Sequence, residues 1–360
     1  MSKEVGLAVR LCALAAVLAC MPSFAQAPGG GPATPPGAAP GAAPAAAAAA
    51  APGGSGPPPD IPSKVQGRAQ YPHHITALLD VTYATLPGFR PLKLDLYYHP
   101  ADRQRRPAVV WVHGGGWGGG NARMVTGLFG PWDEVLARLA ARGYVTLGVD
   151  YRLDGEAKFP AAVQDVKAAI RWARANAAKY GIDPNRIAVW GESAGGQIAA
   201  LVGTSCGVKE LEGDGGNAGE SSCVQAAVDW YGPTDFAQMD ALQTLPGAMK
   251  HGVANSPEST YLGCEVDRCP ASVLRLANPI SFVSATNPPF LIMHGDSDTG
   301  VPWRGSQALY NALRARGVAA QFVLVPGANH IFAGVTRAKA QTLLLQVFDF
   351  LDSTFGVKSK

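Results

Sequence analysis

Along most of the chain, short runs of apolar residues alternate with longer stretches in which apolar positions recur every three or four residues. The short runs, such as 108–112, are typical of strands buried on both faces, and the longer stretches, such as 160–179, are typical of amphipathic helices. Strands are predicted at 81–83, 92–97, 108–112, 145–149, 187–190, 225–229, 290–293 and 320–325, the first two as an antiparallel pair. Helices are predicted at 131–142, 160–179, 194–203, 304–316 and 337–353. This alternation predicts the α/β class, with a mostly parallel central sheet flanked by helices on both faces.

Residues 236–288 break this alternation. The segment is long, has weak periodicity and carries two cysteines, Cys264 and Cys269. Because it precedes the strand at 290–293, we expect it to lie over the carboxyl ends of the strands as a small cap or loop insertion. A structural connection away from any functional site is the alternative.

The N-terminal residues 1–25 are predicted to be a signal peptide. A short positive region precedes an apolar run at 11–19 that is too short to span a bilayer. Small residues at Ser23 and Ala25 then provide a cleavage site. In the alternative interpretation, the sequence VLAC is a lipobox and Cys20 is lipidated, which would anchor the protein to a membrane.

The segment 26–63 consists almost entirely of Ala, Gly and Pro. Such a composition buries too little apolar surface to offset the entropy of ordering, so we expect a disordered linker. Residues 64–360 are then expected to form one α/β domain, a normal size for this class.

Composition narrows the function classes. The net charge of +3 arises from 30 basic and 27 acidic residues that are spread along the chain. No basic cluster with interleaved aromatic residues occurs, so no nucleic-acid partner is expected. The sequence also lacks the H-E-x-x-H pattern and similar ligand motifs, so neither a metal ion nor an organic cofactor is expected.

The cysteines agree with export to an oxidising compartment. Cys12 and Cys20 lie in the predicted signal peptide, and an even number, four, remains in the rest of the chain. Pairing each cysteine with its nearest neighbour in sequence closes the shortest loops and favours the pairs Cys206–Cys223 and Cys264–Cys269. The sequence does not choose among the three possible pairings, and free buried thiols are a further alternative.

The motif G-x-S-x-G occurs at residues 191–195, between a predicted strand and a predicted helix. The glycines allow a strained, tight turn that projects the hydroxyl of Ser193 clear of the backbone. The helix that follows presents its first backbone N–H groups to negative charge developing beside the serine. Ser193 is therefore a candidate nucleophile, with a glycine-rich strand–helix turn as the structural alternative.

A second glycine-rich loop, HGGGW at residues 113–117, follows the strand ending at Val112. If the chain is a hydrolase with Ser193 as its nucleophile, the N–H groups of Gly115 and Gly116 are expected to join that of Ala194 in binding a tetrahedral oxyanion. A phosphate-binding loop is the rival interpretation. It is disfavoured because neither the P-loop pattern nor a dinucleotide fingerprint is present.

The candidate base follows by elimination. In hydrolases with this serine turn the chain order is serine, acid, histidine, and only three of the seven histidines follow Ser193. His251 lies in the irregular segment, and His294 comes too early for an acid to precede it on a strand. His330 follows the strand at 320–325 and is therefore the predicted base.

The acid is expected just after the preceding strand, at 290–293. Asp298 is the predicted acid, holding the imidazole in the correct tautomer. On spacing alone, Asp296 remains an alternative, and Asp229 or Asp235 is a weaker one.

With these motifs in order, residues from about 75 onward resemble the esterase/lipase branch of the α/β-hydrolases, near the hormone-sensitive-lipase and feruloyl-esterase-like carboxylesterases. The motifs are HGGGW, VDYRL at 149–153, FPAAVQDV at 159–166, YGIDP at 180–184, GESAGG at 191–196, HGDSDTGVP at 294–302 and the final His330. The resemblance implies an α/β-hydrolase fold and the same catalytic residues. It also favours Asp298 over Asp296, because the acid of this group lies three residues before Val-Pro.

The resemblance further implies that Trp117 flanks the acyl or alcohol pocket, with plain packing as the alternative. Taken together, the sequence predicts an exported serine carboxylesterase that acts on a small-molecule or polymer-borne ester. An amide or formamide hydrolase with the same residues is one alternative. A non-catalytic binding protein on a hydrolase scaffold is the other.

Overall fold

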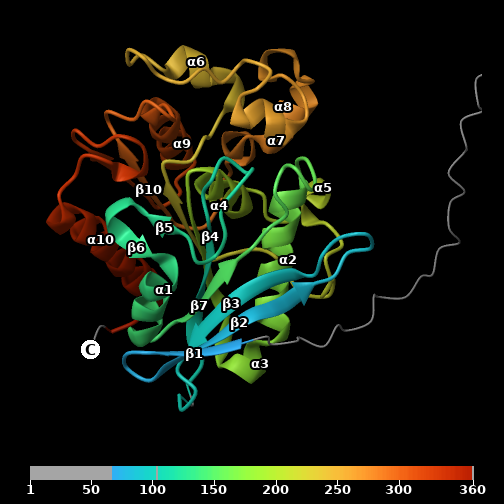
Figure 1. Cartoon of the computed structure of the whole chain (residues 1–360), viewed down its shortest axis with the longest axis vertical. Helices are drawn as coiled ribbons and strands as arrows, with labels where there is room; N and C mark the ends of the chain where they lie inside the picture. The colour runs from blue at the N-terminus through green and yellow to red at the C-terminus, as the bar shows by residue number, and fades with distance from the viewer. Residues whose placement is uncertain (1–66, 103, 359–360) are drawn as a thin grey trace, which may run out of the picture. The chain divides into compact units, whose positions relative to one another are not determined.

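A nine-stranded sheet runs through the protein in the computed structural model, which describes residues 67–102 and 104–358 (Figure 1). The strand order is β1-β2-β3-β7-β4-β8-β9-β10-β11. Strands β1 to β3 pair antiparallel, β3 also pairs antiparallel with β7, and all later neighbours pair parallel. The strands are β1 Gly67–Tyr71, β2 Ile75–Ala84, β3 Leu92–Tyr98, β4 Arg106–Val112, β7 Val145–Val149, β8 Ile182–Glu192, β9 Ala226–Trp230, β10 Phe290–Gly295 and β11 Ala320–Val325.

Helices cover both faces of this sheet, as the sequence predicts. Alternate residues of β4 point to opposite faces: Val110 and Val112 join one buried cluster, and Val109 and Trp111 join the other. The first cluster includes side chains of α2 (Ala161–Ala175), α4 (Ala194–Thr204) and α9 (Trp303–Ala315). The second includes side chains of α1 (Trp132–Ala141) and α10 (Arg337–Phe355), which lie together on the left of Figure 1.

The predicted helix at 160–179 is divided in the structure. Helix α2 ends at Ala175, and a single turn, α3 (Ala177–Tyr180), follows Asn176. The side-chain amide of Asn176 donates to the carbonyl oxygen of Trp172 at 3.0 Å, the same oxygen that accepts the Asn176 backbone N–H. An asparagine that bonds locally to the backbone competes with continuation of the helix, which accounts for the break.

Several small elements, among them the single-turn helix α5 (Lys209–Glu212), were not predicted. Strand β1 precedes the first predicted strand, and a hairpin of β5 (Val125–Thr126) and β6 (Gly130–Pro131) encloses the 3-10 turn η1 (Gly127–Phe129). Strands of two residues carry no periodicity that a sequence pattern can detect.

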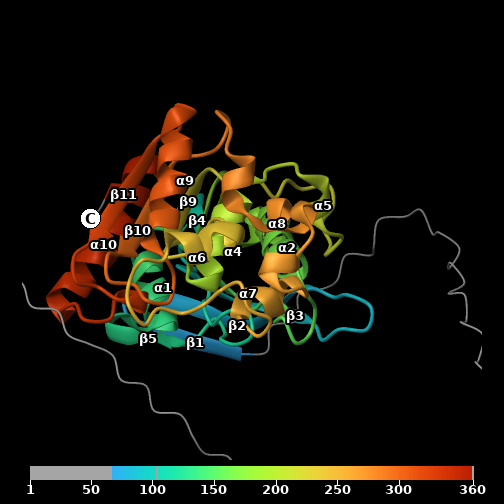
Figure 2. The ribbon, with the colours of Figure 1, turned by 90° about the horizontal axis from the view of Figure 1, so that it is seen from above.

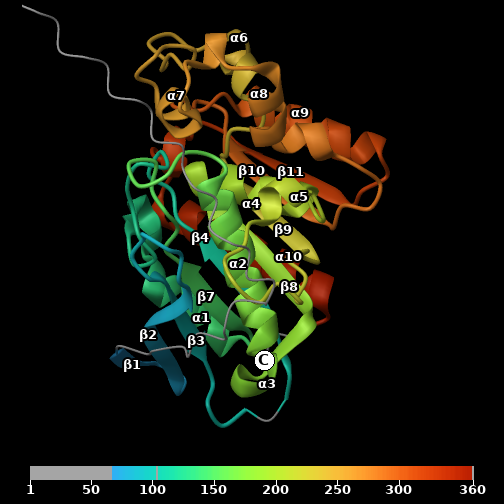
Figure 3. The same ribbon diagram turned by 90° about the vertical axis from the view of Figure 1, so that its right-hand side faces the viewer.

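Residues 236–288 form a series of short helices at the top of Figures 1 and 3. Seen from above in Figure 2, α6, α7 and α8 lie on the side of the sheet toward the viewer. The segment is anchored by aromatic contacts: the rings of Tyr261 and Trp117 stack at 4.6 Å, and Phe236 lies 5.6 Å from Trp117. Its elements are η2 Phe236–Gln238, α6 Met239–Leu242, α7 Pro257–Leu262, η3 Val266–Arg268, α8 Ala271–Ala277 and η4 Pro279–Phe282.

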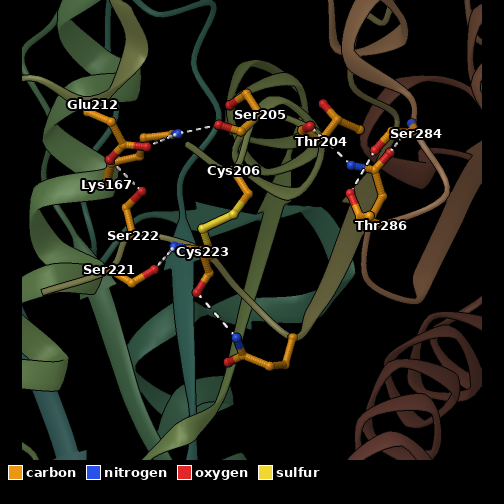
Figure 4. The surroundings of a disulfide bond; sticks show 12 residues. Lys167, Thr204, Ser205, Cys206, Glu212, Ser221, Ser222, Cys223, Ser284 and Thr286 are labelled. Atoms are coloured by element: carbon orange, nitrogen blue, oxygen red, sulfur yellow. Dashed lines mark hydrogen bonds and ion pairs between the residues drawn. A yellow bond between two sulfur atoms is a disulfide. The ribbon is translucent and has the colours of Figure 1, made fainter. Parts of the chain in front are cut away.

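The two disulfides of the structure are the pairs that nearest-neighbour closure favours, Cys206–Cys223 and Cys264–Cys269. Figure 4 shows the first pair beside the buried ammonium group of Lys167. That group donates to the carbonyl oxygen of Ser205 at 2.7 Å and to a carboxylate oxygen of Glu212 at 2.8 Å. Lys167 therefore ties the disulfide-closed loop to α2 by an ion pair with Glu212 and a hydrogen bond to Ser205.

The predicted signal peptide at 1–25, the linker at 26–63 and the lipidation site Cys20 lie outside the described residues. Within the described part of the chain, every helix is too short or too polar to traverse a lipid bilayer.

Candidate active site

Four loops meet around a cleft of about 340 Å³. They follow β4, β8, β10 and β11, and carry the glycine-rich loop 113–117, Ser193, Asp298 and His330, respectively. Because the carboxyl ends of parallel strands lie at one edge of a sheet, residues distant in sequence are brought together there. Ser193 and His330 line the cleft directly.

Ser193 occupies a strained turn between β8 and α4. Its backbone has φ 53° and ψ −120°, a left-handed conformation that L-residues rarely adopt. The flanking glycines are required by close backbone contacts. A Cβ atom on Gly191 would lie 2.0 Å from the carbonyl oxygen of Gly195, and one on Gly195 would lie 2.2 Å from that of Val112. The sequence prediction that small residues permit this turn is thus given a physical basis.

The predicted nucleophile, base and acid form one hydrogen-bonded chain. The hydroxyl of Ser193 lies 2.9 Å from Nε2 of His330, and Nδ1 of His330 lies 2.8 Å from Oδ2 of Asp298. The imidazole of His330 is 28% exposed and the carboxylate of Asp298 is fully buried. This geometry allows a proton to pass from the serine to the imidazole while the carboxylate holds the ring.

The carboxylate of Asp298 is surrounded by N–H donors. Its Oδ1 accepts from the backbone N–H groups of Gly300 and Val301, both at 2.8 Å. Its Oδ2 lies within hydrogen-bond distance of His294 as well as His330. Burial alone would raise the pKa of Asp298, but the hydrogen bonds from the two histidines outweigh it and hold this pKa well below its ordinary value.

The alternative acids do not contact the base. Asp296 accepts the backbone N–H of Gly327 at 2.7 Å and so braces the loop that precedes His330. Asp229 is buried on β9 beside Gly191 of β8, and Asp235 accepts a hydrogen bond from the side chain of Asn278. None of their oxygens is within hydrogen-bond distance of the His330 ring among the described contacts.

The loop that carries His330 is held in an unusual conformation. The side-chain oxygen of Asn329 accepts the backbone N–H of His330 at 2.7 Å and that of Thr299 at 2.9 Å. The two residues after His330, Ile331 and Phe332, have φ values of 57° and 54°. Non-glycine residues in this region store strain that surrounding contacts must offset, so the position of the imidazole is strongly specified.

The glycine-rich loop passes directly beside the nucleophile. A Cβ atom on Gly114 would lie 3.3 Å from that of Ser193, and Gly115 and Gly116 have φ values of 107° and 59°. Gly115, Gly116 and Ala194 all line the cleft, as expected of candidate oxyanion donors. His113, which precedes them, is buried, and burial lowers its pKa to about 4. Its neutral ring donates to the carbonyl oxygen of Gly114 at 2.7 Å.

Trp117 combines packing with a position at the cleft. Its indole is 2% exposed, stacks on Tyr261 and donates from Nε1 to the side-chain oxygen of Gln197 at 3.1 Å. It also lines the cleft. The tryptophan therefore joins the 236–288 segment to the wall of the site, and its contact with substrate stays a prediction.

Comparison with known proteins assigns the chain to a family. The BD-FAE family matches residues 94–313, more than half of the chain. The chain belongs to the BD-FAE family. Its fold is that of the α/β-hydrolases, as the sequence motifs indicate.

Several relatives of this BD-FAE chain carry esterase names. Esterase LipQ of Mycobacterium tuberculosis is 30% identical over 281 residues, which cover 77% of this chain and 62% of LipQ. The chain thus spans about three fifths of the length of that relative. A truncated carbohydrate esterase from gut microbiota is 31% identical, with a TM-score of 0.66, over 79% of this chain and 98% of that one. The propionate-bound esterase Est2 of Thermogutta terrifontis is 27% identical, with a TM-score of 0.61, over 78% and 95%.

One residue of this BD-FAE site was missed by the sequence analysis although it precedes the nucleophile. The buried carboxylate of Glu192 accepts the hydroxyl of Thr126 at 2.6 Å, that of Tyr231 at 2.9 Å and the backbone N–H of Gly114. Burial raises the pKa of Glu192 above its ordinary value. Its position inside G-x-S-x-G was visible in the sequence, but its partners come from three other segments.

The two remaining histidines after Ser193 have other roles in the structure. His251 lies in the 236–288 segment, with Nδ1 3.0 Å from a carboxylate oxygen of Glu258. His294 is buried on β10 and contacts the same carboxylate as His330 does. Neither contacts Ser193, in agreement with the choice of His330 as the candidate base.

Proposed function

We propose that this chain is an exported serine carboxylesterase in which Ser193 is the nucleophile, His330 the base and Asp298 the acid. The observation that carries the proposal is the hydrogen-bonded chain from the Ser193 hydroxyl through His330 to Asp298, at 2.9 and 2.8 Å. The names of the relatives, esterase LipQ and the propionate-bound esterase Est2, support ester hydrolysis as the reaction class.

Acylation begins when the oxygen of Ser193 attacks the ester carbonyl while Nε2 of His330 takes the hydroxyl proton. The carbonyl oxygen becomes an oxyanion, which the backbone N–H groups of Gly115, Gly116 and Ala194 stabilise. Collapse of this intermediate breaks the ester bond, and His330 gives its proton to the departing alcohol.

Deacylation repeats these steps with water as the nucleophile. His330 takes a proton from water, the resulting oxygen attacks the acyl carbon, and the same N–H groups bind the second oxyanion. Ser193 then leaves with the proton held by the imidazole, and the carboxylic acid is released. Asp298 remains ionised throughout and stabilises the imidazolium form of His330.

The mouth of the cleft supports an ester with an apolar acyl or alcohol group. Val125, Met249 and Ile331 come from three separate segments, all line the cleft, and are 64%, 47% and 38% exposed, respectively. Exposed apolar side chains grouped around a cavity are typical of a binding surface rather than of ordinary protein surface. A panel of small-molecule and polymer-borne esters tests which of the two the cleft accepts.

Export is the part of the proposal that rests on the sequence most directly. It is supported by the predicted signal peptide at 1–25 and by the disulfides Cys206–Cys223 and Cys264–Cys269, which suit an oxidising compartment. Lipidation at Cys20 is the alternative form of the exported protein. Mass spectrometry of the mature N-terminus distinguishes a chain starting near residue 26 from a lipidated one.

The proposed activity is tested with Ser193→Ala and a fluorophosphonate probe, which labels only an activated serine. The wild type should hydrolyse p-nitrophenyl butyrate and become labelled. The variant should lose on the order of 10⁶-fold in kcat and remain unlabelled. Ser281→Ala, at an exposed serine of η4, is the matched control and should behave as the wild type. Undiminished turnover in Ser193→Ala would refute the assignment.

A further inference from the structure

His294 is a fully buried imidazole beside the proposed active site, and the mechanism above does not use it. It lies on β10, and its Nε2 is 3.1 Å from Oδ2 of Asp298 and 3.1 Å from the carbonyl oxygen of Val301. Its Nδ1 is 2.8 Å from the hydroxyl of Ser306, on α9. Both ring nitrogens therefore have a specific polar partner in a site closed to water.

The partners of His294 determine which nitrogen carries a proton. Nε2 faces an ionised carboxylate and a carbonyl oxygen, and both of these groups only accept hydrogen bonds. Nε2 must therefore be the donor. The hydroxyl of Ser306 either donates or accepts, so it satisfies Nδ1 in the neutral ring and in the charged one. In each case a proton lies between Nε2 and Asp298.

The hydrogen bond from Nε2 of His294 completes the set of donors around the Asp298 carboxylate. A carboxylate offers about four lone-pair sites. Gly300 and Val301 occupy Oδ1, and His330 and His294 share Oδ2. Because both imidazoles donate to one oxygen, the negative charge available to His330 is reduced by the bond to His294.

We propose that His294 is a positioning residue for the base: its Nε2–H fixes the shared oxygen of Asp298 and weakens the pull of that oxygen on the His330 proton. Consequently, His330 is available as a base at lower pH than it would be if it were the only imidazole hydrogen-bonded to Asp298. This inference rests on the proposed function, because it concerns the pH dependence of the proposed base.

Three other titratable groups face the ring of His330, and one of them, Tyr231, also lies 6.4 Å from the ring of His294. Glu192 approaches from the end of β8, and the ring of Tyr231, after β9, lies 5.1 Å from the His330 ring. Asp298 faces the imidazole from the loop after β10. A change in pH dependence that follows the hydrogen-bonding capacity of residue 294 therefore reports on its contact with Asp298.

Two variants separate the hydrogen bond from the bulk of the side chain. His294→Phe keeps a ring but removes the donor, whereas His294→Gln offers an amide N–H to Asp298 and an amide oxygen to Ser306. In a plot of kcat/KM against pH for p-nitrophenyl butyrate, we expect the acid limb of His294→Phe to move upward by about half to one pH unit. His294→Gln should restore the wild-type limb. Ile292→Val, at another buried position of β10, is the control for general loosening of the strand.

An unshifted acid limb in folded, active His294→Phe would overturn the inference. So would an equal shift in His294→Gln, or in Ile292→Val, because either result would point to packing. Fluorophosphonate labelling is measured on the same samples: a wild type that is not labelled contradicts the proposed function itself, whereas a labelled wild type with an unshifted variant contradicts only the role of His294.

A spectroscopic measurement on the wild type does not depend on whether the variants fold. Nitrogen-15 NMR of labelled histidine should show that Nε2 of His294 carries a proton at every pH at which the protein is folded. The proton on Nε2 should also show the NMR signature of a hydrogen bond to the Asp298 carboxylate. A His294 ring protonated on Nδ1 alone would overturn the inference.

Discussion

Replacing Asp298 with asparagine tests the proposed acid with almost no change in volume. In the wild type, Oδ1 accepts two backbone N–H groups and Oδ2 faces His294 and His330. The backbone donors require an oxygen at the first position, so the amide NH₂ of the variant must occupy the second. There it donates to Nδ1 of His330 and moves the ring proton to Nε2, the nitrogen that has to accept the proton of Ser193.

The expected loss is on the order of 10⁴-fold in kcat, which corresponds to about 5 kcal/mol of activation free energy. The assay is hydrolysis of p-nitrophenyl butyrate at pH 8, with circular dichroism to confirm folding. Asp296→Asn is the matched control because Asp296 only braces the neighbouring loop, through Gly327. The reasoning fails if Asp298→Asn retains more than about a tenth of the wild-type kcat, or if Asp296→Asn loses as much as Asp298→Asn does.

Three further experiments test stability and specificity. Burial raises the pKa of Asp229 to about 7, so the native state binds this proton more tightly than the unfolded chain, whose carboxyl has a pKa near 3.9. The wild type should therefore lose stability as pH rises from about 4 to 7, and Asp229→Asn should gain up to about 4 kcal/mol relative to it, measured by urea unfolding at pH 4.5 and 8. A constant difference between the two proteins would contradict this linkage. Replacing Cys206 and Cys223 together with serine opens a loop of 17 residues and should lower the free energy of unfolding by about 3 kcal/mol in the same assay. Met249→Gln should lower kcat/KM about fivefold for p-nitrophenyl octanoate but not for the acetate, whereas Leu345→Gln, at an exposed apolar residue of α10, should change neither. Equal losses on both esters would argue against an apolar mouth.

The strands and long helices of the core could be predicted because burial on two faces imposes a simple pattern. The run at 108–112 is apolar throughout since alternate side chains enter the two clusters that flank the sheet. The exact end of α2 could not be predicted, because it depends on one local hydrogen bond from Asn176 to Trp172. The hairpin of β5 and β6 is held by a hydrogen bond from Thr126 to Glu192, a residue remote in sequence. Such a contact leaves no pattern of apolar residues in the sequence.

The candidate catalytic residues could be predicted because chain order and strand position restrict them strongly. Ser193, Asp298 and His330 each follow a recognisable strand, and a parallel sheet brings such positions to one edge. The contacts of His294 could not be predicted in this way. Its sequence position excluded it as the base, but only the paths of β10 and the following loop place its ring against Asp298.

The site behaves as one connected network because Glu192 links loops that are separate in sequence. Its backbone belongs to the turn that holds Ser193, and its carboxylate accepts hydrogen bonds from Thr126, Tyr231 and Gly114. Thr126 belongs to the hairpin at the mouth, the ring of Tyr231 lies against that of His330, and Gly114 begins the candidate oxyanion loop. A buried carboxylate that lacks hydrogen-bond partners is energetically unfavourable. Loss of one hydrogen bond to Glu192 would therefore also destabilise the arrangement of its other partners. A movement of the mouth hairpin would therefore disturb the nucleophile, the base and the oxyanion loop together, although no atom of the hairpin takes part in the proposed chemistry.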